Sequence, residues 1–307
     1  MRAIVQTELG GPEVLREQIQ DRPTPGIGQV LLRVHAAGVN PADAMNRATG
    51  AFSGQPPFVL GWDISGTVAA VGPGVTLFQP GDEAFGLLPF PQGSGGYAEY
   101  ALIATRSLVR KPVSIDHEQA AALPLAGLTA WQALVETAGV GEGSRVLITA
   151  ASGGVGHLAV QIAASRGAHV VAVASAANAD YLRGLGADEV IDYHTVDFSE
   201  TVRDIDVVLE AVGGDYPERA LRVLRRGGTL VSTLPQSLAG ARAKASDLGI
   251  RVVGLFVESD RLGLTAIAHL VDEGRLAPTI AATYPLDQAS TAHATTHGPG
   301  KVVLRIA

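Results

Sequence analysis

Residues 145–156 read RVLITAASGGVG, an apolar strand that runs into a turn of small residues and then into a helix. Small residues at such a turn let the backbone approach a pyrophosphate and let the helix pack against the strand. The N-terminus of the helix adds partial positive charge for the phosphates. Ala150 occupies the usual first glycine position. We predict a dinucleotide site formed by Ser152, Gly153, Gly154, Val155 and Gly156. The alternative is a tight strand–helix turn that binds no ligand.

The next strand decides which dinucleotide such a site would prefer. It ends in VASAA at residues 173–177, and no carboxylate follows before Asp180. An NAD site usually places Asp or Glu here to accept from the ribose 2′-hydroxyl. Since no acid is present to repel a 2′-phosphate, the sequence favours NADPH over NADH. Ser175 could instead cap the following helix, and the two roles are compatible.

Outward from this turn, strands and helices alternate. We predict strands at 146–149, 170–174, 189–191, 207–210, 229–233 and 251–256, and helices at 116–122, 128–138, 154–166, 178–185 and 260–272. This alternation predicts an α/β fold with a doubly wound parallel sheet covered on both faces. The first 120 residues instead hold short strands, at 3–7, 30–36, 66–71 and 99–103, separated by turn clusters. They predict a compact, barrel-like β domain, to which a strand at 301–306 would return.

Composition excludes several classes of protein. The chain has 307 residues, enough for two domains, and a formal net charge of −7, which argues against binding to nucleic acid or anionic membranes. It contains no cysteine, so disulfides, catalytic thiols, thiolate zinc sites and iron–sulfur clusters are excluded. Its 37 glycines, in a chain that is 47% hydrophobic, indicate many tight turns in a folded body.

No targeting signal is visible in the first residues, MRAIVQTELGG, which lack an apolar core and a cleavage site. The uncharged stretch 146–165 has the length of a membrane span but contains the glycine-rich turn. We expect a soluble, cytoplasmic protein.

Eight strings occur in one order along the chain. They are AAGVNPAD (36–43), LGWDISG (60–66), VGPGVTLFQPGD (71–82), GGYAEY (95–100), LTAWQAL (128–134), AASGGVG (150–156), LGADEVIDY (185–193) and GKVVL (300–304). With these strings the chain resembles the medium-chain dehydrogenase/reductase superfamily, in its zinc-free quinone oxidoreductase branch, the zeta-crystallin-like enzymes. The resemblance implies a GroES-like catalytic domain over residues 1–121 and 276–307 and a Rossmann NADPH-binding domain over 122–275. It also implies a homodimer formed through the Rossmann sheet.

The same resemblance implies that no metal takes part. Zinc-dependent relatives have Cys and His where this chain has Asn40 and Trp62, and neither residue replaces a thiolate or imidazole in a tetrahedral zinc site. The other candidate pair, His293 and His297, lacks a third ligand or an intervening Glu, and we expect two solvated histidines.

Family roles carry over residue by residue. Asn40 matches the residue facing the nicotinamide, and Thr129 matches one near its ribose phosphate. The remaining expected cofactor contacts are Ser175, Asn178, Tyr193, Phe256 and Lys301. Asn178 stands where a lysine is usual, which weakens the electrostatic preference for a 2′-phosphate, and Arg183 is a candidate to compensate.

The expected reaction is hydride transfer from NADPH to a quinone or an α,β-unsaturated carbonyl compound. Asn40 or a backbone N–H would stabilise the developing oxyanion, and the proton would come from solvent or Tyr97. Phe52, Trp62 and Phe85 are candidate walls of an apolar substrate pocket, or plain core. Two alternatives stay open, an enoyl reductase of a biosynthetic pathway and a low-turnover NADPH-binding sensor or scaffold.

Overall fold

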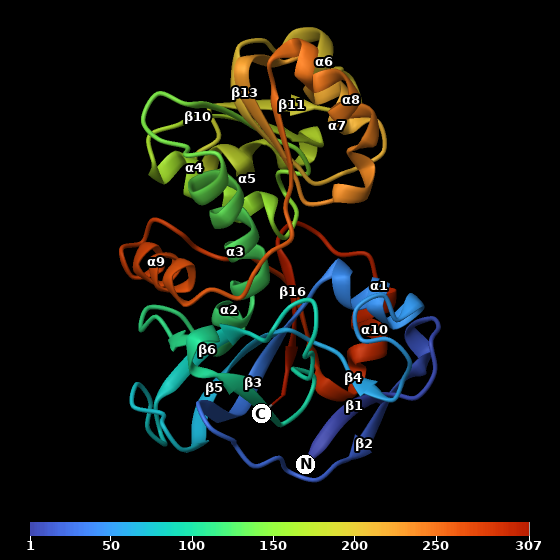
Figure 1. Cartoon of the computed structure of the whole chain (residues 1–307), viewed down its shortest axis with the longest axis vertical. Coiled ribbons are helices and arrows are strands. Elements are labelled where there is room, and N and C mark those ends of the chain that lie inside the picture. Colours follow the sequence, from blue (N-terminus) through green and yellow to red (C-terminus); the bar gives the residue numbers. More distant parts are fainter. Residues whose placement is uncertain (307) are drawn as a thin grey trace. The chain divides into compact units, whose positions relative to one another are not determined.

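The computed structural model describes residues 1–306, which form two compact units (Figure 1). The first unit comprises Met1–Leu128, Glu258–Gly274 and residues 278–306, and the second comprises Thr129–Val257 and Arg275–Ala277. The chain therefore leaves the first unit, builds the second and returns.

The first unit is rich in short strands. They are β1 (Arg2–Gln6), β2 (Leu15–Ile19), β3 (Gln29–Val39), β4 (Phe58–Val59), β5 (Asp63–Val71), β6 (Glu83–Leu87), β7 (Tyr100–Ala104), β8 (Leu108–Arg110), β15 (Ile280–Pro285) and β16 (Lys301–Arg305). One sheet has the order β2-β1-β4, and the other has the order β15-β16-β3-β5-β6-β8, with β7 also paired to β3. The returning strand β16 lies antiparallel to β3, with Leu304 opposite Ala37. The C-terminal segment is thereby built into the N-terminal β unit.

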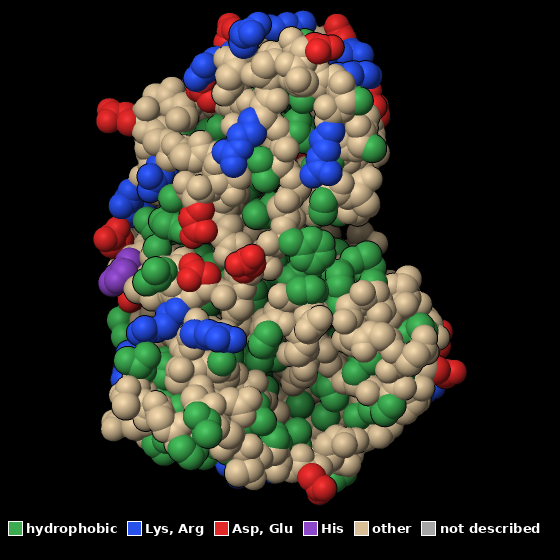
Figure 2. All heavy atoms as spheres, viewed as in Figure 1, with side chains coloured by type: hydrophobic (Ala, Val, Ile, Leu, Met, Phe, Trp, Pro, Cys, Tyr) green, Lys and Arg blue, Asp and Glu red, His purple; other side chains and the backbone are tan. Residues whose placement is uncertain are grey.

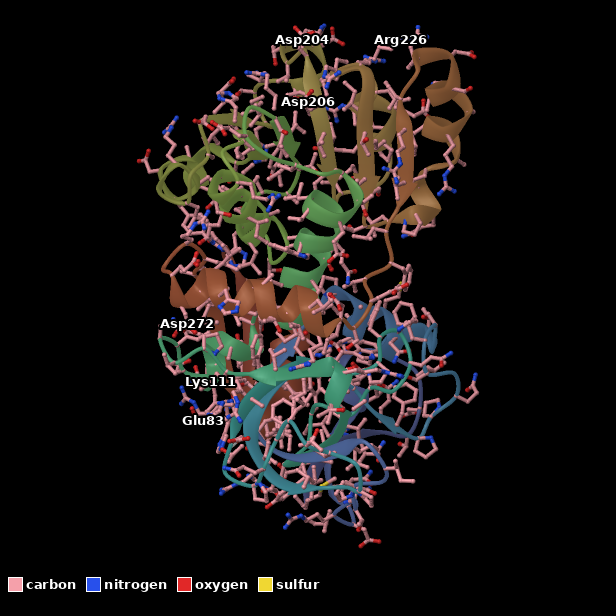
Figure 3. All side chains as sticks on the ribbon, turned by 60° about the vertical axis from the view of Figure 1, so that its left-hand side comes forward. Glu83, Lys111, Asp204, Asp206, Arg226 and Asp272 are labelled. Atoms are coloured by element: carbon pink, nitrogen blue, oxygen red, sulfur yellow. The ribbon has the colours of Figure 1, made fainter. Side chains whose placement is uncertain are left out.

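Helices of this unit pack on its sheets. They are α1 (Pro41–Thr49), α2 (His117–Ala121), α9 (Arg261–Asp272) and α10 (Ala289–Ala294), together with the start of α3 (Pro124–Trp131). Helix α9 packs near β8, and its last residue, Asp272, accepts from Ser114 Oγ at 3.0 Å, close to the Lys111–Glu83 ion pair of 3.4 Å (Figure 3). This packing places α9 in the first unit, whereas the sequence analysis assigned residues 122–275 to the Rossmann domain.

The second unit is a parallel sheet with helices on it. Its strands are β9 (Arg145–Ile148), β10 (His169–Ala174), β11 (Glu189–Asp192), β12 (Ile205–Glu210), β13 (Leu224–Ser232) and β14 (Arg251–Gly254), in the order β11-β10-β9-β12-β13-β14. Its helices are α4 (Gly156–Ser165), α5 (Ala179–Gly184), α6 (Phe198–Thr201), α7 (Tyr216–Ala220) and α8 (Ala239–Leu248). The predicted helix 128–138 is instead the end of α3 followed by a π-helical segment, Gln132–Thr137.

Strand order in this sheet locates a binding edge. The chain runs outward from β9 to β11 and then restarts on the other side of β9 with β12. Ligands of open α/β sheets bind at the carboxyl ends of the strands where the order reverses, which here lies between β9 and β12. The turn at 150–156 follows β9 directly and so lies at that edge.

The surface of the second unit mixes charges of both signs. Around α6 to α8 the ion pairs Arg222–Glu200 and Lys244–Glu218 cross between elements, and Figure 2 shows cationic and anionic side chains interspersed there. Within residues 1–306, no helix has both the length and the hydropathy to cross a membrane.

Candidate functional site

The turn after β9 is tightly folded. Ala150 has φ of 47°, in the left-handed region where glycine is usual, and Gly153 N donates to Ala150 O at 2.9 Å. A Cβ added at Gly156 would lie 2.6 Å from Ala151 Cα and closer still to Ala150 O. Because α4 begins at Gly156, the absence of a side chain there lets the helix N-terminus pack directly against the turn, where backbone N–H groups can bind a phosphate.

Three residues that sequence analysis missed hold this edge in place. Buried His157 lies with Nδ1 2.9 Å from Gly153 O, so the imidazole donates to the turn. Thr149 Oγ1 accepts from Ala211 N at 2.9 Å, which ties β9 to the chain after β12. Buried Glu210 accepts from Val212 N at 2.6 Å and from Ser232 Oγ at 2.6 Å. A buried acid at the end of a central strand was the available signal for Glu210.

Asn178 connects the turn to the end of β10. Its Nδ2 donates to Ser152 Oγ at 3.1 Å and to Ser175 Oγ at 3.2 Å, so the structure brings these three predicted residues together. Each serine hydroxyl keeps its own hydrogen for another acceptor. Arg183 donates to Asp180 at 3.0 Å, so its guanidinium already has an anionic partner.

The other predicted cofactor contacts of the second unit are less clustered. Tyr193 is exposed just after β11, with its ring centroid 4.2 Å from that of His194. Thr129 is buried in α3, and Phe256 is about half exposed after β14. None of the three has a described contact with Asn178, and their roles stay predictions.

In the first unit, Asn40 is the N-cap of α1 and is oriented by two opposite charges. Its Nδ2 donates to Asp63 Oδ2 at 2.9 Å, and its Oδ1 accepts from the ammonium of Lys301. Lys301 also donates to Asp63 Oδ2 and to Val39 O, both at 3.2 Å. The three side chains are 4% exposed or less. The three ammonium hydrogens of Lys301 are thus used within the protein, while one Nδ2 hydrogen of Asn40 has no acceptor among the described residues.

Asp43, one turn further along α1, holds the backbone around Asn40. Its Oδ2 accepts from Asn40 N at 2.8 Å, and its Oδ1 accepts from Gly61 N at 2.9 Å. Burial, opposed by these two hydrogen bonds and reinforced by the charge of Asp63, raises the pKa of Asp43 to about 7.

Tyr97 and His293 lie beside Asp43, and the prediction that His293 is solvated was wrong. His293 Nε2 is 3.1 Å from the Tyr97 hydroxyl, and its Nδ1 is 2.9 Å from Arg47 NH1. Burial, with the charge of Arg47, lowers the pKa of His293 to about 4. Burial and the charge of Asp43 raise the pKa of Tyr97 well above its ordinary value. The sequence could not reveal this, because residues 97 and 293 come from distant segments. His297 is likewise partly buried, with Nε2 3.1 Å from Ala292 O and its ring packed against that of Tyr284.

The three aromatic residues predicted to line a substrate pocket differ in their burial and packing. Phe52 and Trp62 pack edge to face, with ring centroids 5.9 Å apart, and Phe90 joins them at 5.4 and 5.1 Å. Phe90 was missed, because it lies outside any strand or helix and its contacts come from distant segments. Phe85 is fully buried on β6, as is Trp62 just before β5. Phe52 and Phe90 are the partly exposed members of the cluster.

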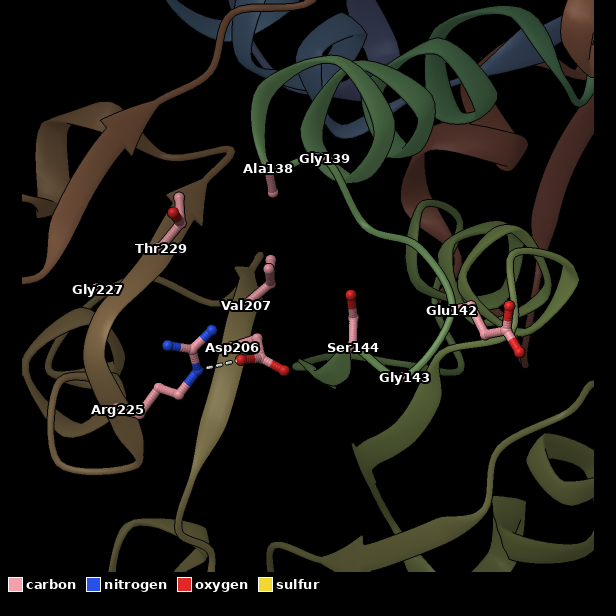
Figure 4. Close-up of a pocket in the computed structure, with 10 residues that line it drawn as sticks. All are labelled: Ala138, Gly139, Glu142, Gly143, Ser144, Asp206, Val207, Arg225, Gly227 and Thr229. Carbon is pink, nitrogen blue, oxygen red and sulfur yellow. Dashed lines mark hydrogen bonds and ion pairs between the residues drawn. The ribbon is translucent and has the colours of Figure 1, made fainter.

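An open pocket of about 400 Å³ lies elsewhere on the second unit, between residues such as Ser144, Val207 and Thr229 (Figure 4). It sits at the amino ends of β9, β12 and β13, opposite the edge that carries the glycine-rich turn. Arg225 and Asp206 pair with each other across its wall. Among residues 1–306, no group of three or more His, Asp or Glu side chains is arranged to hold a metal ion.

Known proteins resemble the chain over its whole length. Residues 26–113 match the family model described as "Alcohol dehydrogenase GroES-like domain", and residues 185–304 match "Zinc-binding dehydrogenase". The NAD(P)H oxidoreductase RTN4IP1, mitochondrial, of Mus musculus is 34% identical, covering 100% of this chain and 89% of the relative. The quinone oxidoreductase of Pongo abelii is 34% identical, covering 98% and 95%.

A solved structure agrees with these relatives. The quinone oxidoreductase of Coxiella burnetii superimposes with a TM-score of 0.92 at 35% identity, over 100% of this chain and 99% of that one. Because both domains and full-length relatives match in the same order, the chain belongs to the medium-chain dehydrogenase/reductase superfamily of oxidoreductases, as a quinone oxidoreductase-like member.

Proposed function

We propose that this protein is an NADPH-dependent reductase that transfers hydride to a quinone or an α,β-unsaturated carbonyl compound without a metal ion. The observation that carries the proposal is the buried Asn40 amide, oriented by Asp63 and Lys301 so that one N–H remains for a ligand. The printed names of the relatives, quinone oxidoreductase and NAD(P)H oxidoreductase, support the reaction class.

The second unit supplies a fitting place for the dinucleotide. Gly156 lets the start of α4 pack against the backbone of Ala150 and Ala151, where a side chain would clash. Asn178 joins the Ser152 hydroxyl, in the turn after β9, to the Ser175 hydroxyl at the end of β10, where a 2′-phosphate would be read. When bound, a reduced nicotinamide supplies the hydride, and the chain has to bind, orient and exclude water.

Asn40 would act on the acceptor's carbonyl oxygen. When hydride adds to a conjugated acceptor, negative charge develops on that oxygen, and a fixed N–H donor stabilises it. The ammonium of Lys301 on Asn40 Oδ1 withdraws electron density from the amide and strengthens its N–H as a donor. In this proposal Lys301 acts through Asn40, in place of the direct cofactor contact expected from the resemblance.

Solvent is the better candidate for the proton. The Tyr97 hydroxyl is fully buried and bonded to His293, and its raised pKa makes it a weaker acid than an ordinary phenol. Tyr97 is therefore not required to donate directly to the acceptor.

The test is steady-state consumption of NADPH with para-quinones, alkenals and enoyl thioesters, using enzyme dialysed against a chelator. Turnover with quinones or alkenals is expected, together with a loss of kcat of about 100-fold in Asn40→Ala. Preference for enoyl thioesters would favour a biosynthetic enoyl reductase. Calorimetric binding of NADPH with no turnover would favour a sensor or scaffold. Activity that returns only with stoichiometric zinc would refute metal independence.

A further inference from the structure

Arg47, His293, Tyr97 and Asp43 form a chain of buried or half-buried polar groups that the proposed reaction does not use. They come from three segments of the first unit: α1 carries Arg47 and Asp43, α10 carries His293, and the loop before β7 carries Tyr97. Arg47 also donates from Nε to Gly10 O at 3.2 Å, which fixes its guanidinium. The group thus joins segments that are far apart along the chain.

Hydrogen-bond chemistry gives this group one direction. Arginine only donates, so Nδ1 of His293 accepts from Arg47 and carries no proton. In a neutral imidazole the proton is then on Nε2, which donates to the Tyr97 oxygen. With that oxygen accepting, the Tyr97 hydrogen is free to be donated elsewhere, and the carboxylate of Asp43, whose charge raises the pKa of Tyr97, is the nearby acceptor. We call the order Arg47→His293→Tyr97→Asp43 the relay.

The relay ends on the carboxylate that holds the backbone of Asn40. Asp43 accepts from Asn40 N and Gly61 N. Its negative charge also acts on the nearby Tyr97 hydroxyl. The Tyr97 ring also lies against the Gly61 backbone. Gly61 has φ of 92°, and a Cβ there would lie 2.7 Å from Tyr97 Cε1. Shifting Tyr97 would therefore disturb both the carboxylate and the segment that precedes Trp62 and Asp63.

We propose that Arg47, His293 and Tyr97 are positioning residues, which hold Asp43 and through it the direction in which Asn40 presents its amide. That Asn40 donates a hydrogen bond to the carbonyl oxygen of the substrate rests on the proposed function. The direction of the hydrogen bonds in the relay does not. The charged and titratable groups that face the relay are Asp63 on β5, Lys301 on β16 and Glu13 near Arg47.

Nitrogen NMR of ¹⁵N-histidine-labelled protein tests the direction of the relay without cofactor. His293 is expected as the Nε2–H tautomer and uncharged between about pH 5 and 8, where ordinary histidines titrate. The Nδ1–H tautomer, or a normal titration, would overturn the relay. In uniformly ¹⁵N-labelled protein, Tyr97→Phe should shift the side-chain amide resonances of Asn40 relative to the wild type. Unchanged resonances would overturn the positioning role.

Kinetics of matched variants test the consequence for the reaction. Tyr97→Phe and His293→Leu should lower kcat roughly tenfold with little change in KM for the cofactor. His293→Gln should recover most of the loss, since a glutamine side chain can accept from Arg47 and donate to Tyr97. The control His269→Leu, at an exposed position of α9, should leave kcat unchanged.

The outcomes separate the two proposals. Folded Tyr97→Phe and His293→Leu variants with unchanged kcat would refute positioning. If His293→Leu does not fold, Tyr97→Phe and the rescue by His293→Gln carry the test. If the wild-type protein has no turnover, the proposed function fails, while the tautomer and the Asn40 resonances still decide the relay.

Discussion

A single buried amide, that of Asn40, is flanked by a cation on its oxygen and an anion on its nitrogen. This pairing fixes which end of the amide is which. In the flipped orientation, Nδ2 would face the Lys301 ammonium and Oδ1 would face the Asp63 carboxylate, and neither pair could form a hydrogen bond. The same pairing neutralises the charges of Lys301 and Asp63, which are 3% and 0% exposed. The function of one residue is thus defined by neighbours from β5 and β16.

His293 gives a prediction for stability against pH. Its pKa is about 4 in the folded protein, against 6.5 for an ordinary histidine. Between these values the unfolded chain binds a proton that the folded protein does not, so the free energy of unfolding decreases as pH falls. In His293→Gln this contribution is absent, and urea unfolding at several pH values should show a shallower decrease. The same series on His269→Gln serves as control, and parallel curves for wild type and His293→Gln would contradict the prediction.

Asn178 gives a prediction for cofactor choice. Lysine at this position would place a cation beside Ser152 and Ser175, and a phosphate prefers charge-assisted hydrogen bonds. We expect Asn178→Lys to bind NADPH about tenfold more tightly, with NADH affinity little changed, in isothermal titration. Asn178→Met removes the amide without adding charge. Its affinities therefore measure the effect of losing the hydrogen bonds to Ser152 and Ser175 alone. Equal shifts for both cofactors would show that position 178 does not read the 2′ substituent.

At the scale of elements, the strand–turn–helix unit from β9 to α4 combines a strained residue with a crowded one. Ala150 adopts the left-handed conformation that favours glycine, while Gly156 has no room for a side chain. Hydrogen bonds from His157 and to Thr149 support the turn from both ends. Neighbouring elements thus hold the turn in a shape that local preference alone would not select.

Gly156→Ala tests this crowding. A helical Gly→Ala change by itself stabilises by about 1 kcal/mol, but here the new Cβ would meet Ala150 O and Ala151 Cα. We expect cofactor affinity to fall about tenfold or more and the melting temperature to decrease. Gly184→Ala, at the end of α5 where a Cβ would meet nothing within 4 Å, is the matched control. Wild-type affinity in Gly156→Ala would mean that the cofactor does not bind at this turn.

At the scale of the whole molecule, the parallel sheet has an open edge. Among the described residues β14 pairs with β13, and the chain just beyond it carries Phe256, which is 48% exposed. Unpaired edge strands are free to pair with another chain. We therefore retain the proposal of a homodimer formed through this sheet. Light scattering after size exclusion should give twice the chain mass of 31.6 kDa, and a monomer at micromolar concentration would refute the proposal.

Local patterns were sufficient for much of the fold. The alternation of strands and helices predicted the doubly wound sheet, and the glycine-rich string located its turn within two residues of the start of α4. Shorter elements such as β4 and α6 escaped, because two to four residues carry too little periodicity to be recognised. The π-helical segment at 132–137 also escaped, since its apolar pattern resembles that of an ordinary helix.

The sequence by itself determined the fold class and the family and located the glycine-rich turn after β9, because each depends on patterns among neighbours along the chain. Only the tertiary structure decided that Lys301 and Asp63 orient Asn40, and that His293 is a half-buried partner of Tyr97 and Arg47. These contacts join residues 23 to 261 positions apart, so their hydrogen bonds and the pKa shifts that follow from burial exist only once the strands and helices have packed.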